Sequence, residues 1–250
     1  MVKKTFILFS RVVIATFISF CFFAWTYAEA HSILLKINRN NTCKNSSPDI
    51  NRNNTYKDSS PGNDVMKPLI YLYPEAEIEV SVKLGHPEKL SHSYPKYENG
   101  WIVNTKPNGD LTYNNRSYYG LYWEGKNAPI FDTNEGFVVK GRDTITFLEE
   151  KLAILGLNER EANEFIVYWL PKLENNPYNY IVFASMEMQN EYMPLEISPK
   201  PNTLIRVLMG FKKLDKPIEI KEQVLAPTPT RTGFVAIEWG GTEINSNIVY

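Results

Sequence analysis

The chain has 250 residues, and its 27 basic and 28 acidic side chains nearly cancel to a formal net charge of −1. Hydrophobic residues make up 43% of the sequence and aromatic residues 13%, which excludes disorder along the whole chain and allows a core of useful size. Proteins that bind nucleic acid usually present a strongly basic face, so the balanced charge argues against nucleic acid as a partner.

The first thirty residues have the order of a secretory signal peptide. A basic start precedes an apolar stretch over residues 12–25, and Ala28-Glu29-Ala30 places small residues at a cleavage site. The alternative is an uncleaved single-pass anchor, but Arg11 leaves the apolar stretch shorter than the ~20 residues of a membrane span. We therefore predict a signal peptide over residues 1–30 and a secreted, cell-surface or periplasmic protein. Any membrane contact would come through this segment alone.

A polar segment over residues 31–66 is predicted to be a disordered tether. It contains a tandem repeat of 13 residues, 37–49 followed at once by 50–62, and is rich in Asn, Ser, Lys and Asp. Such a segment buries too little apolar surface to offset its ordering entropy. Its Asn-x-Ser/Thr sequons matter only in a eukaryotic secretory pathway. After cleavage only Cys43 remains, so we expect a fold without an intramolecular disulfide.

The chain from residue 67 onward has the pattern of one β-rich domain, predicted to span residues 67–244 and to end in a tail at 245–250. Apolar or alternating runs separated by Asn-Gly and Gly turns predict strands. In chain order these runs cover residues 69–73, 78–84, 101–104, 118–123 and 137–139.

Helical periodicity then replaces the strand pattern. Asp143 is the candidate N-cap of a first helix, and Asn158 with Glu161 approximates the capping box of a second. Strand patterns return over residues 180–184, 204–211, 218–220 and 234–239. Strands, a helix pair and strands again predict an α+β fold, a mainly antiparallel sheet or sandwich with an inserted α-helical hairpin.

Motifs for nucleophilic, phosphate and metal chemistry are incomplete. A hydrolytic triad lacks a Gly-x-Ser-x-Gly elbow, and the bulky residues of Gly120–Asn127 do not suit a phosphate-binding loop. Asp132–Gly136 begins like a calcium loop without its later carboxylate, and His31, a possible copper ligand at a mature N-terminus, begins the polar tether. We therefore predict no metal and no other cofactor.

Two carboxylates beside tryptophans suggest one enzymatic alternative. Glu124 follows Trp123 and Glu238 precedes Trp239, each at the end of a predicted strand. An extracellular glycan hydrolase would use Glu124 and Glu238 as an acid/base pair if their carboxyl groups lay about 5–10 Å apart. Both can equally be charged strand ends that face water, so the sequence leaves this hypothesis open.

The leading hypothesis is an exported, non-catalytic domain that binds an extracellular protein or glycan. Four aromatic residues are the candidate binding residues, because tyrosine and tryptophan combine a large apolar face with a polar group. They are Trp101, Tyr118, Tyr119 and Trp123.

Several longer phrases resemble a known family. They include Lys67-Pro-Leu-Ile-Tyr-Leu-Tyr-Pro74, Leu121-Tyr-Trp-Glu-Gly125, Glu161-Ala-Asn-Glu-Phe-Ile-Val-Tyr-Trp-Leu-Pro171 and Ile237-Glu-Trp-Gly-Gly241. The chain is similar to a family of mostly bacterial, often exported, uncharacterised proteins with an Ile-Tyr-Leu-Tyr-Pro phrase at the start of the domain. The resemblance covers about residues 67–244 and implies one domain that contains the helix pair. It implies no activity, cofactor or catalytic residue.

Overall fold

The computed structural model describes residues 64–228 and 230–244, which belong to one compact unit of the chain. The predicted signal peptide, both copies of the repeat, Cys43 and the tail at 245–250 lie outside the described residues. No helix of the described part combines the length and the apolar character needed to cross a membrane.

The end of the predicted tether already belongs to the folded domain. Val65 is 1% exposed, and its backbone exchanges two hydrogen bonds with Gly125, 2.7 and 3.1 Å long. The first strand, β1, begins at Met66. The packed part of the chain therefore includes at least two residues before residue 67, because a single buried valine does not show in the polar composition around it.

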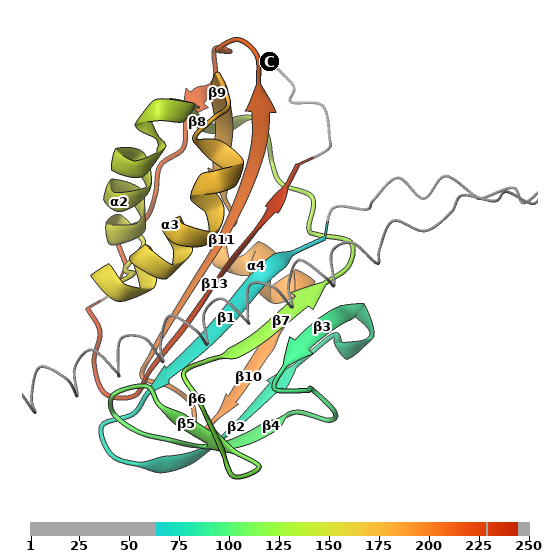
Figure 1. Cartoon of the computed structure of the whole chain (residues 1–250), viewed down its shortest axis with the longest axis vertical. Helices are drawn as coiled ribbons and strands as arrows, with labels where there is room; N and C mark the ends of the chain where they lie inside the picture. The colour runs from blue at the N-terminus through green and yellow to red at the C-terminus, as the bar shows by residue number, and fades with distance from the viewer. Residues whose placement is uncertain (1–63, 229, 245–250) are drawn as a thin grey trace, which may run out of the picture. The chain divides into compact units, whose positions relative to one another are not determined.

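The larger of two sheets has eight strands in the order β12-β8-β9-β11-β13-β1-β7-β3 (Figure 1). Two neighbouring pairs, β11 with β13 and β12 with β8, are parallel, and the other pairs are antiparallel, so the sheet is mixed. The strands are β1 (Met66–Tyr73), β3 (Leu90–Tyr94), β7 (Leu121–Gly125), β8 (Glu135–Lys140), β9 (Tyr178–Phe183), β11 (Thr203–Leu214), β12 (Lys221–Glu222) and β13 (Val235–Glu243).

The smaller sheet has five strands and is antiparallel throughout. In spatial order they are β10 (Leu195–Ser198), β2 (Ile78–Leu84), β4 (Trp101–Thr105), β5 (Leu111–Tyr113) and β6 (Arg116–Tyr118). Asn114 and Asn115 join β5 to β6 with φ angles of 49° and 61°. Asparagine tolerates this left-handed backbone, which two-residue hairpin turns require.

Three α-helices complete the described part: α2 (Thr144–Ile154), α3 (Glu159–Leu173) and α4 (Met186–Tyr192). Single 3₁₀ turns lie at Pro87–Lys89 and Gly141–Asp143. The predicted capping box of α3 is confirmed, since Asn158 Oδ1 accepts from the Glu161 backbone N–H and Glu161 Oε2 accepts from that of Asn158, both at 2.9 Å.

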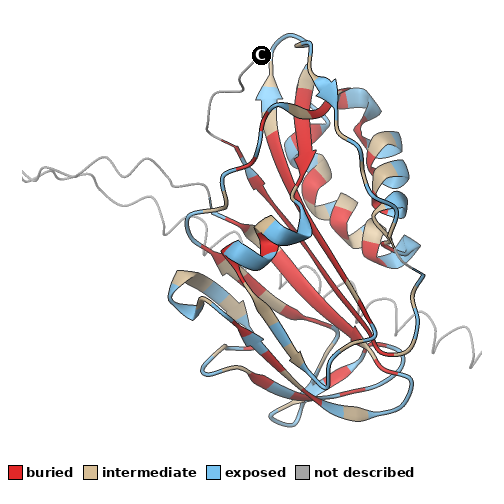
Figure 2. Ribbon diagram, turned by 180° about the vertical axis from the view of Figure 1, so that it is seen from behind, coloured by how far each residue is buried: buried red, intermediate tan, exposed pale blue. Residues whose placement is uncertain are grey.

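Strand alternation divides the core into two clusters on opposite faces of the eight-stranded sheet. Leu69 and Tyr71 of β1 pack with residues of α2 and α3, whereas Ile70 and Leu72 pack with the small sheet and the region of α4. Figure 2 shows the buried residues concentrated along the central strands between these layers. The predicted β-rich α+β class is thereby confirmed.

Some predicted elements differ from the structure. The run at residues 118–123 is interrupted at Tyr119 and Gly120, and its two parts enter different sheets as β6 and β7. Residues 218–220 form no strand, and the short β12 begins just after them.

Candidate functional site

The eight-stranded sheet is wider than the helices that cover it. Eight strands at ~4.8 Å spacing span about 34 Å, while two packed helices cover about 20 Å. Figure 1 shows α2 and α3 beside the β8, β9 and β11 side of the sheet, with β7 and β3 away from them. A strip of the helix-side face therefore stays open between α3 and the far edge of the sheet.

This open strip holds a cleft of about 560 Å³, which we call the tyrosine cleft. Five tyrosines, from β3, β6, the β6–β7 connection, β7 and α3, meet there with one lysine and one glutamate. The lining residues are Lys67, Leu69, Tyr94, Ser117, Tyr118, Tyr119, Gly120, Tyr122, Glu124 and Tyr168. The volume lies within the range of pockets that bind small ligands.

A β-bulge at the start of β1 places Lys67 at the cleft. Between the register pairs Met66–Gly241 and Leu69–Trp239, β1 has two residues, Lys67 and Pro68, where β13 has one. Lys67 has φ 60°, a left-handed conformation that costs a non-glycine residue about 1 kcal/mol or more. Bulges re-aim side chains, and strained residues cluster at functional sites.

The Lys67 ammonium lies between two tyrosine rings of the cleft. Its Nζ is 5.6 Å from the ring centroid of Tyr122 and 5.6 Å from that of Tyr168. The Nζ of Lys172, one turn further along α3, is 5.7 Å from the same Tyr168 ring. These distances are those of cation–π contacts, which hold an ammonium without neutralising it.

Glu124 has several partners on the cleft wall. Its Oε1 accepts from the Lys67 backbone N–H at 3.4 Å, and its Oε2 lies 3.3 Å from Nδ1 of His92 on the neighbouring strand β3. Burial and a hydrogen bond to the Glu124 carboxylate raise the pKa of Tyr122 well above its usual range, and burial with the charge of Glu124 raises the pKa of Tyr168. Both phenols therefore keep their protons to a higher pH than an ordinary tyrosine does.

The floor and far wall of the cleft require a close approach of two chain segments. At Gly120 an added Cβ would lie 2.9 Å from Leu69 Cδ1 and 3.1 Å from the Ile70 carbonyl oxygen, so a larger side chain would displace the floor. Tyr94 and Tyr118 meet edge to face with centroids 5.4 Å apart. Tyr94 is 53% and Tyr119 is 49% exposed, which leaves their rings accessible to a ligand.

Glu238 lies on the opposite face of the same sheet and is sealed in the core. Its Oε1 accepts from the indole N–H of Trp123 at 2.9 Å, and its Oε2 accepts from Arg206 Nε at 2.7 Å and forms an ion pair with Nη2 at 2.6 Å. Arg206 also donates to Asn190 Oδ1 and to the Met193 carbonyl oxygen, which attaches α4 and the chain after it to the sheet. Every charge in this group has a partner.

The structure does not bring Glu124 and Glu238 into one cleft. Glu238 pairs in register with Ile70, which pairs with Leu121, so that face also receives Trp123, while Glu124 points to the helix side. The hypothesis that these two glutamates act together across a glycosidic bond is corrected by this arrangement, because a sheet separates them.

The prediction of four aromatic binding residues is also corrected, because two of them are buried. Trp101 is fully buried and donates its indole N–H to the Pro95 carbonyl oxygen, and Trp123 is 2% exposed. Of the four candidates, only Tyr118 and Tyr119 line the cleft. Sequence reasoning missed Lys67, Tyr94, Tyr122 and Tyr168. The available signal was the lysine before proline at the start of a strand and the alternation of Tyr122 with Trp123.

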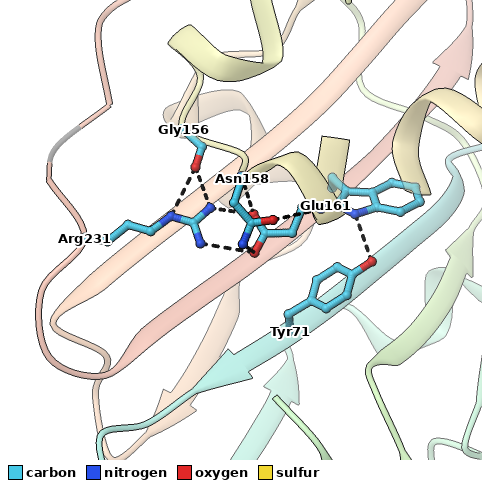
Figure 3. A network of polar contacts seen from close by, with 6 residues as sticks. Tyr71, Gly156, Asn158, Glu161 and Arg231 are labelled. Atoms are coloured by element: carbon cyan, nitrogen blue, oxygen red, sulfur yellow. Dashed lines mark hydrogen bonds and ion pairs between the residues drawn. The ribbon is translucent and has the colours of Figure 1, made fainter. Parts of the chain in front are cut away.

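A polar network anchors the start of α3, the helix that carries Tyr168. Glu161 is fully buried and forms an ion pair with Arg231, which also donates to the Gly156 carbonyl oxygen (Figure 3). One turn further along α3, Glu164 accepts from the Tyr71 hydroxyl at 2.6 Å. That hydroxyl in turn accepts from the indole N–H of Trp239 at 3.2 Å. These bonds fix α3 against β1 beside the cleft.

The other sequence motifs have local structural roles in the described part. Asp132 Oδ1 accepts from both nitrogens of Asn134, a self-contained polar turn. The run that resembled a phosphate loop is β7, and His86 pairs with Glu88 at 3.3 Å. His31 lies outside the described residues.

Comparison with known proteins yields one informative match. No family model matches the chain, and no solved structure matches it either. A Butyrivibrio fibrisolvens protein described as "uncharacterized protein in bglA 3'region" is 35% identical over 65 residues, which make up 25% of this chain and 68% of that protein. Because the match spans more than two thirds of that protein, the chain belongs to the same family as this Butyrivibrio fibrisolvens protein.

Proposed function

We propose that the protein is an exported, non-catalytic binding domain whose ligand is a glycan held in the tyrosine cleft. The observation that carries this proposal is the convergence of five tyrosines on one open concavity of about 560 Å³. In this interpretation α2 and α3 form a hairpin inserted between β8 and β9, and α3 supplies one wall of the site.

The chemistry of the lining favours a sugar. Aromatic rings offer apolar faces for the C–H groups of a pyranose, and phenol hydroxyls offer hydrogen bonds to its hydroxyl groups at small conformational cost. The Tyr122 hydroxyl is hydrogen-bonded to Glu124, which holds its ring in the cleft wall beside Tyr168. Ser117 adds a hydroxyl group, as sugar-binding sites commonly require a few placed polar groups.

A glycan array probed with the full chain tests the proposal directly. We expect Tyr94→Ala and Tyr119→Ala each to weaken binding about tenfold, since exposed aromatic residues at the centre of a site contribute most of the affinity. Tyr178→Ala is the matched control, because Tyr178 is half-buried on β9 and does not line the cleft. Its affinity should equal that of the wild type.

Three outcomes would overturn the proposal. They are absence of binding to every glycan, binding that neither cleft variant changes, or binding to a peptide array alone. Turnover of a bound glycan would overturn the non-catalytic part while leaving the site in place.

A further inference from the structure

We propose that the ligand of the tyrosine cleft carries a carboxylate, as a uronic acid residue does, and that Lys67 is the residue that binds it. This inference rests on the proposed function, because it specifies the class of glycan that the same cleft takes. It concerns the distribution of charge within the cleft, which the tyrosines alone do not determine.

The positive charge of Lys67 has no anionic partner within the described residues. Its ammonium contacts the faces of Tyr122 and Tyr168, and no carboxylate of residues 64–228 or 230–244 forms an ion pair with it. An ammonium has three N–H donors, and an aromatic face satisfies none of them as an oxygen does. The cleft therefore presents an ammonium that is held in place and still able to donate.

The negative charge of Glu124 is in the opposite situation. Its carboxylate contacts the Lys67 backbone N–H and His92 Nδ1, and it also forms a side-chain hydrogen bond with Tyr122. The protein thus supplies partners for the one acidic group that lines the cleft. A ligand that brings its own acid can pair with Lys67 without displacing an existing ion pair.

A second cation reinforces this imbalance. Lys172 holds its ammonium 5.7 Å from the ring of Tyr168, whose other cation contact is Lys67. Glu164, one turn before Tyr168 on α3, is engaged by the Tyr71 hydroxyl at 2.6 Å and by Arg160 at 3.6 Å. Two cations on one ring, beside acids that already have partners, favour an anionic ligand.

The backbone indicates that Lys67 is positioned and not an ordinary surface lysine. It is half-buried, has φ 60°, and lies in the β-bulge opposite Gly240, where Pro68 packs 3.0 Å from the place of a Gly240 Cβ. The bulge fixes the position of the Lys67 Cα, and the rings of Tyr122 and Tyr168 hold its ammonium group. A ligand carboxylate would meet a preorganised donor, which reduces the entropic cost of binding.

The test compares a uronic acid oligosaccharide with its carboxyl-reduced, neutral counterpart, titrated calorimetrically into the full chain. We expect the acidic sugar to bind about tenfold more tightly, as one hydrogen-bonded charge pair provides. Lys67→Met should abolish this preference, because it lowers the affinity for the acidic sugar about tenfold more than the affinity for the neutral sugar. Lys67→Arg should restore the preference. Lys140→Met, at an exposed position on β8, is the matched control and should change neither affinity.

A salt titration of the wild type keeps the test decisive if Lys67→Met fails to fold. Affinity for the acidic sugar should fall as ionic strength rises, while affinity for the neutral sugar stays constant. Equal affinity for the two sugars, with no salt dependence, would overturn this inference. If Tyr119→Ala still weakens that binding, the proposed function stands. Binding of acidic peptides without any sugar would overturn both.

Discussion

The two faces of the eight-stranded sheet each carry a glutamate beside a tryptophan in sequence, but the two glutamates have opposite surroundings. On the helix side the side chain of Glu124 is 22% exposed and lies in an open cleft, whereas on the other face the side chain of Glu238 is 5% exposed and fully paired. Trp123, the sequence neighbour of Glu124, donates its N–H to Glu238. Neighbours along a strand point to opposite faces, so Trp123 shares its face of the sheet with Glu238 and not with Glu124.

The difference teaches which carboxylate has room for a ligand. The Arg206–Glu238 pair is shielded from solvent, and Arg206 attaches α4 to the sheet, so we assign this pair a structural role. Glu124 lies on the strip of the sheet that α2 and α3 leave uncovered, and it lines the cleft together with tyrosines. Stability measurements and binding measurements should therefore separate the two faces.

The largest effect is expected on the sealed face. Glu238→Gln leaves Arg206 buried without a counter-charge, and we expect the free energy of unfolding to fall by about 3–5 kcal/mol, measured by urea denaturation. Glu243→Gln, at the exposed end of the same strand, should change it by less than about 0.5 kcal/mol.

The double variant Arg206→Met with Glu238→Met sharpens this result. It removes both charges together, so its loss should be smaller than that of Glu238→Gln alone. A loss below about 1 kcal/mol for Glu238→Gln would contradict the view that this ion pair is sealed from water.

A smaller effect is expected at the network that anchors α3. Glu161→Gln weakens the capping box and removes the ion pair with Arg231, and we expect a loss of about 2 kcal/mol. Glu159→Gln, in the same helical turn but exposed, is the control and should cost less than about 0.5 kcal/mol. Equal losses in thermal melts of the two variants would show that the network does not stabilise α3.

Tyr71 lies between the covered and the open parts of the helix-side face. Tyr71→Phe removes the bond to Glu164 and leaves the Trp239 N–H without its acceptor, so we expect a loss of about 1.5 kcal/mol at neutral pH. Burial and the Glu164 carboxylate raise the pKa of Tyr71 far above its ordinary value of 10.0.

The raised pKa also gives this variant a pH dependence of definite sign. The unfolded chain loses the phenol proton near pH 10, while the folded chain keeps it, so the contribution of Tyr71 is complete below pH 10 and declines above it. Phenylalanine does not titrate. The difference in unfolding free energy between wild type and Tyr71→Phe should therefore shrink as pH rises above 10, and a difference that grows would contradict the assignment.

Local signals in the sequence were sufficient for much of the fold. The capping box at Asn158 and Glu161 and the alternation in β2 depend on near neighbours, and both were predictable. Short strands such as β3 and β10 were missed because they take their order from partners far along the chain. The hypothesis that Glu124 and Glu238 act as a pair failed because strand alternation and register place their side chains on opposite faces of the sheet.

The cleft itself was only partly predictable. Tyr118 and Tyr119 were identified as candidates. Tyr168, however, comes from a helix 44 positions further along the chain than Glu124, and only the packing of α3 on the sheet brings both to one cleft. The phrases that suggested a family contribute Lys67, Tyr122, Glu124 and Tyr168 to one site. The spacing of these phrases in the sequence does not indicate that the four residues lie in one cleft.

The smallest change in stability is expected at Glu124, and it distinguishes the faces most sharply. Glu124→Gln should alter the free energy of unfolding by less than about 0.5 kcal/mol, because Glu124 is partly exposed and its amide replacement still accepts from the Lys67 N–H. The same change removes a negative charge from the cleft. Affinity for the uronic acid oligosaccharide should therefore rise about twofold, opposite in sign to Lys67→Met, while the neutral sugar serves as the control. A fall in acidic affinity would show that Glu124 contacts the ligand directly, since loss of a hydrogen bond would then outweigh relief of repulsion.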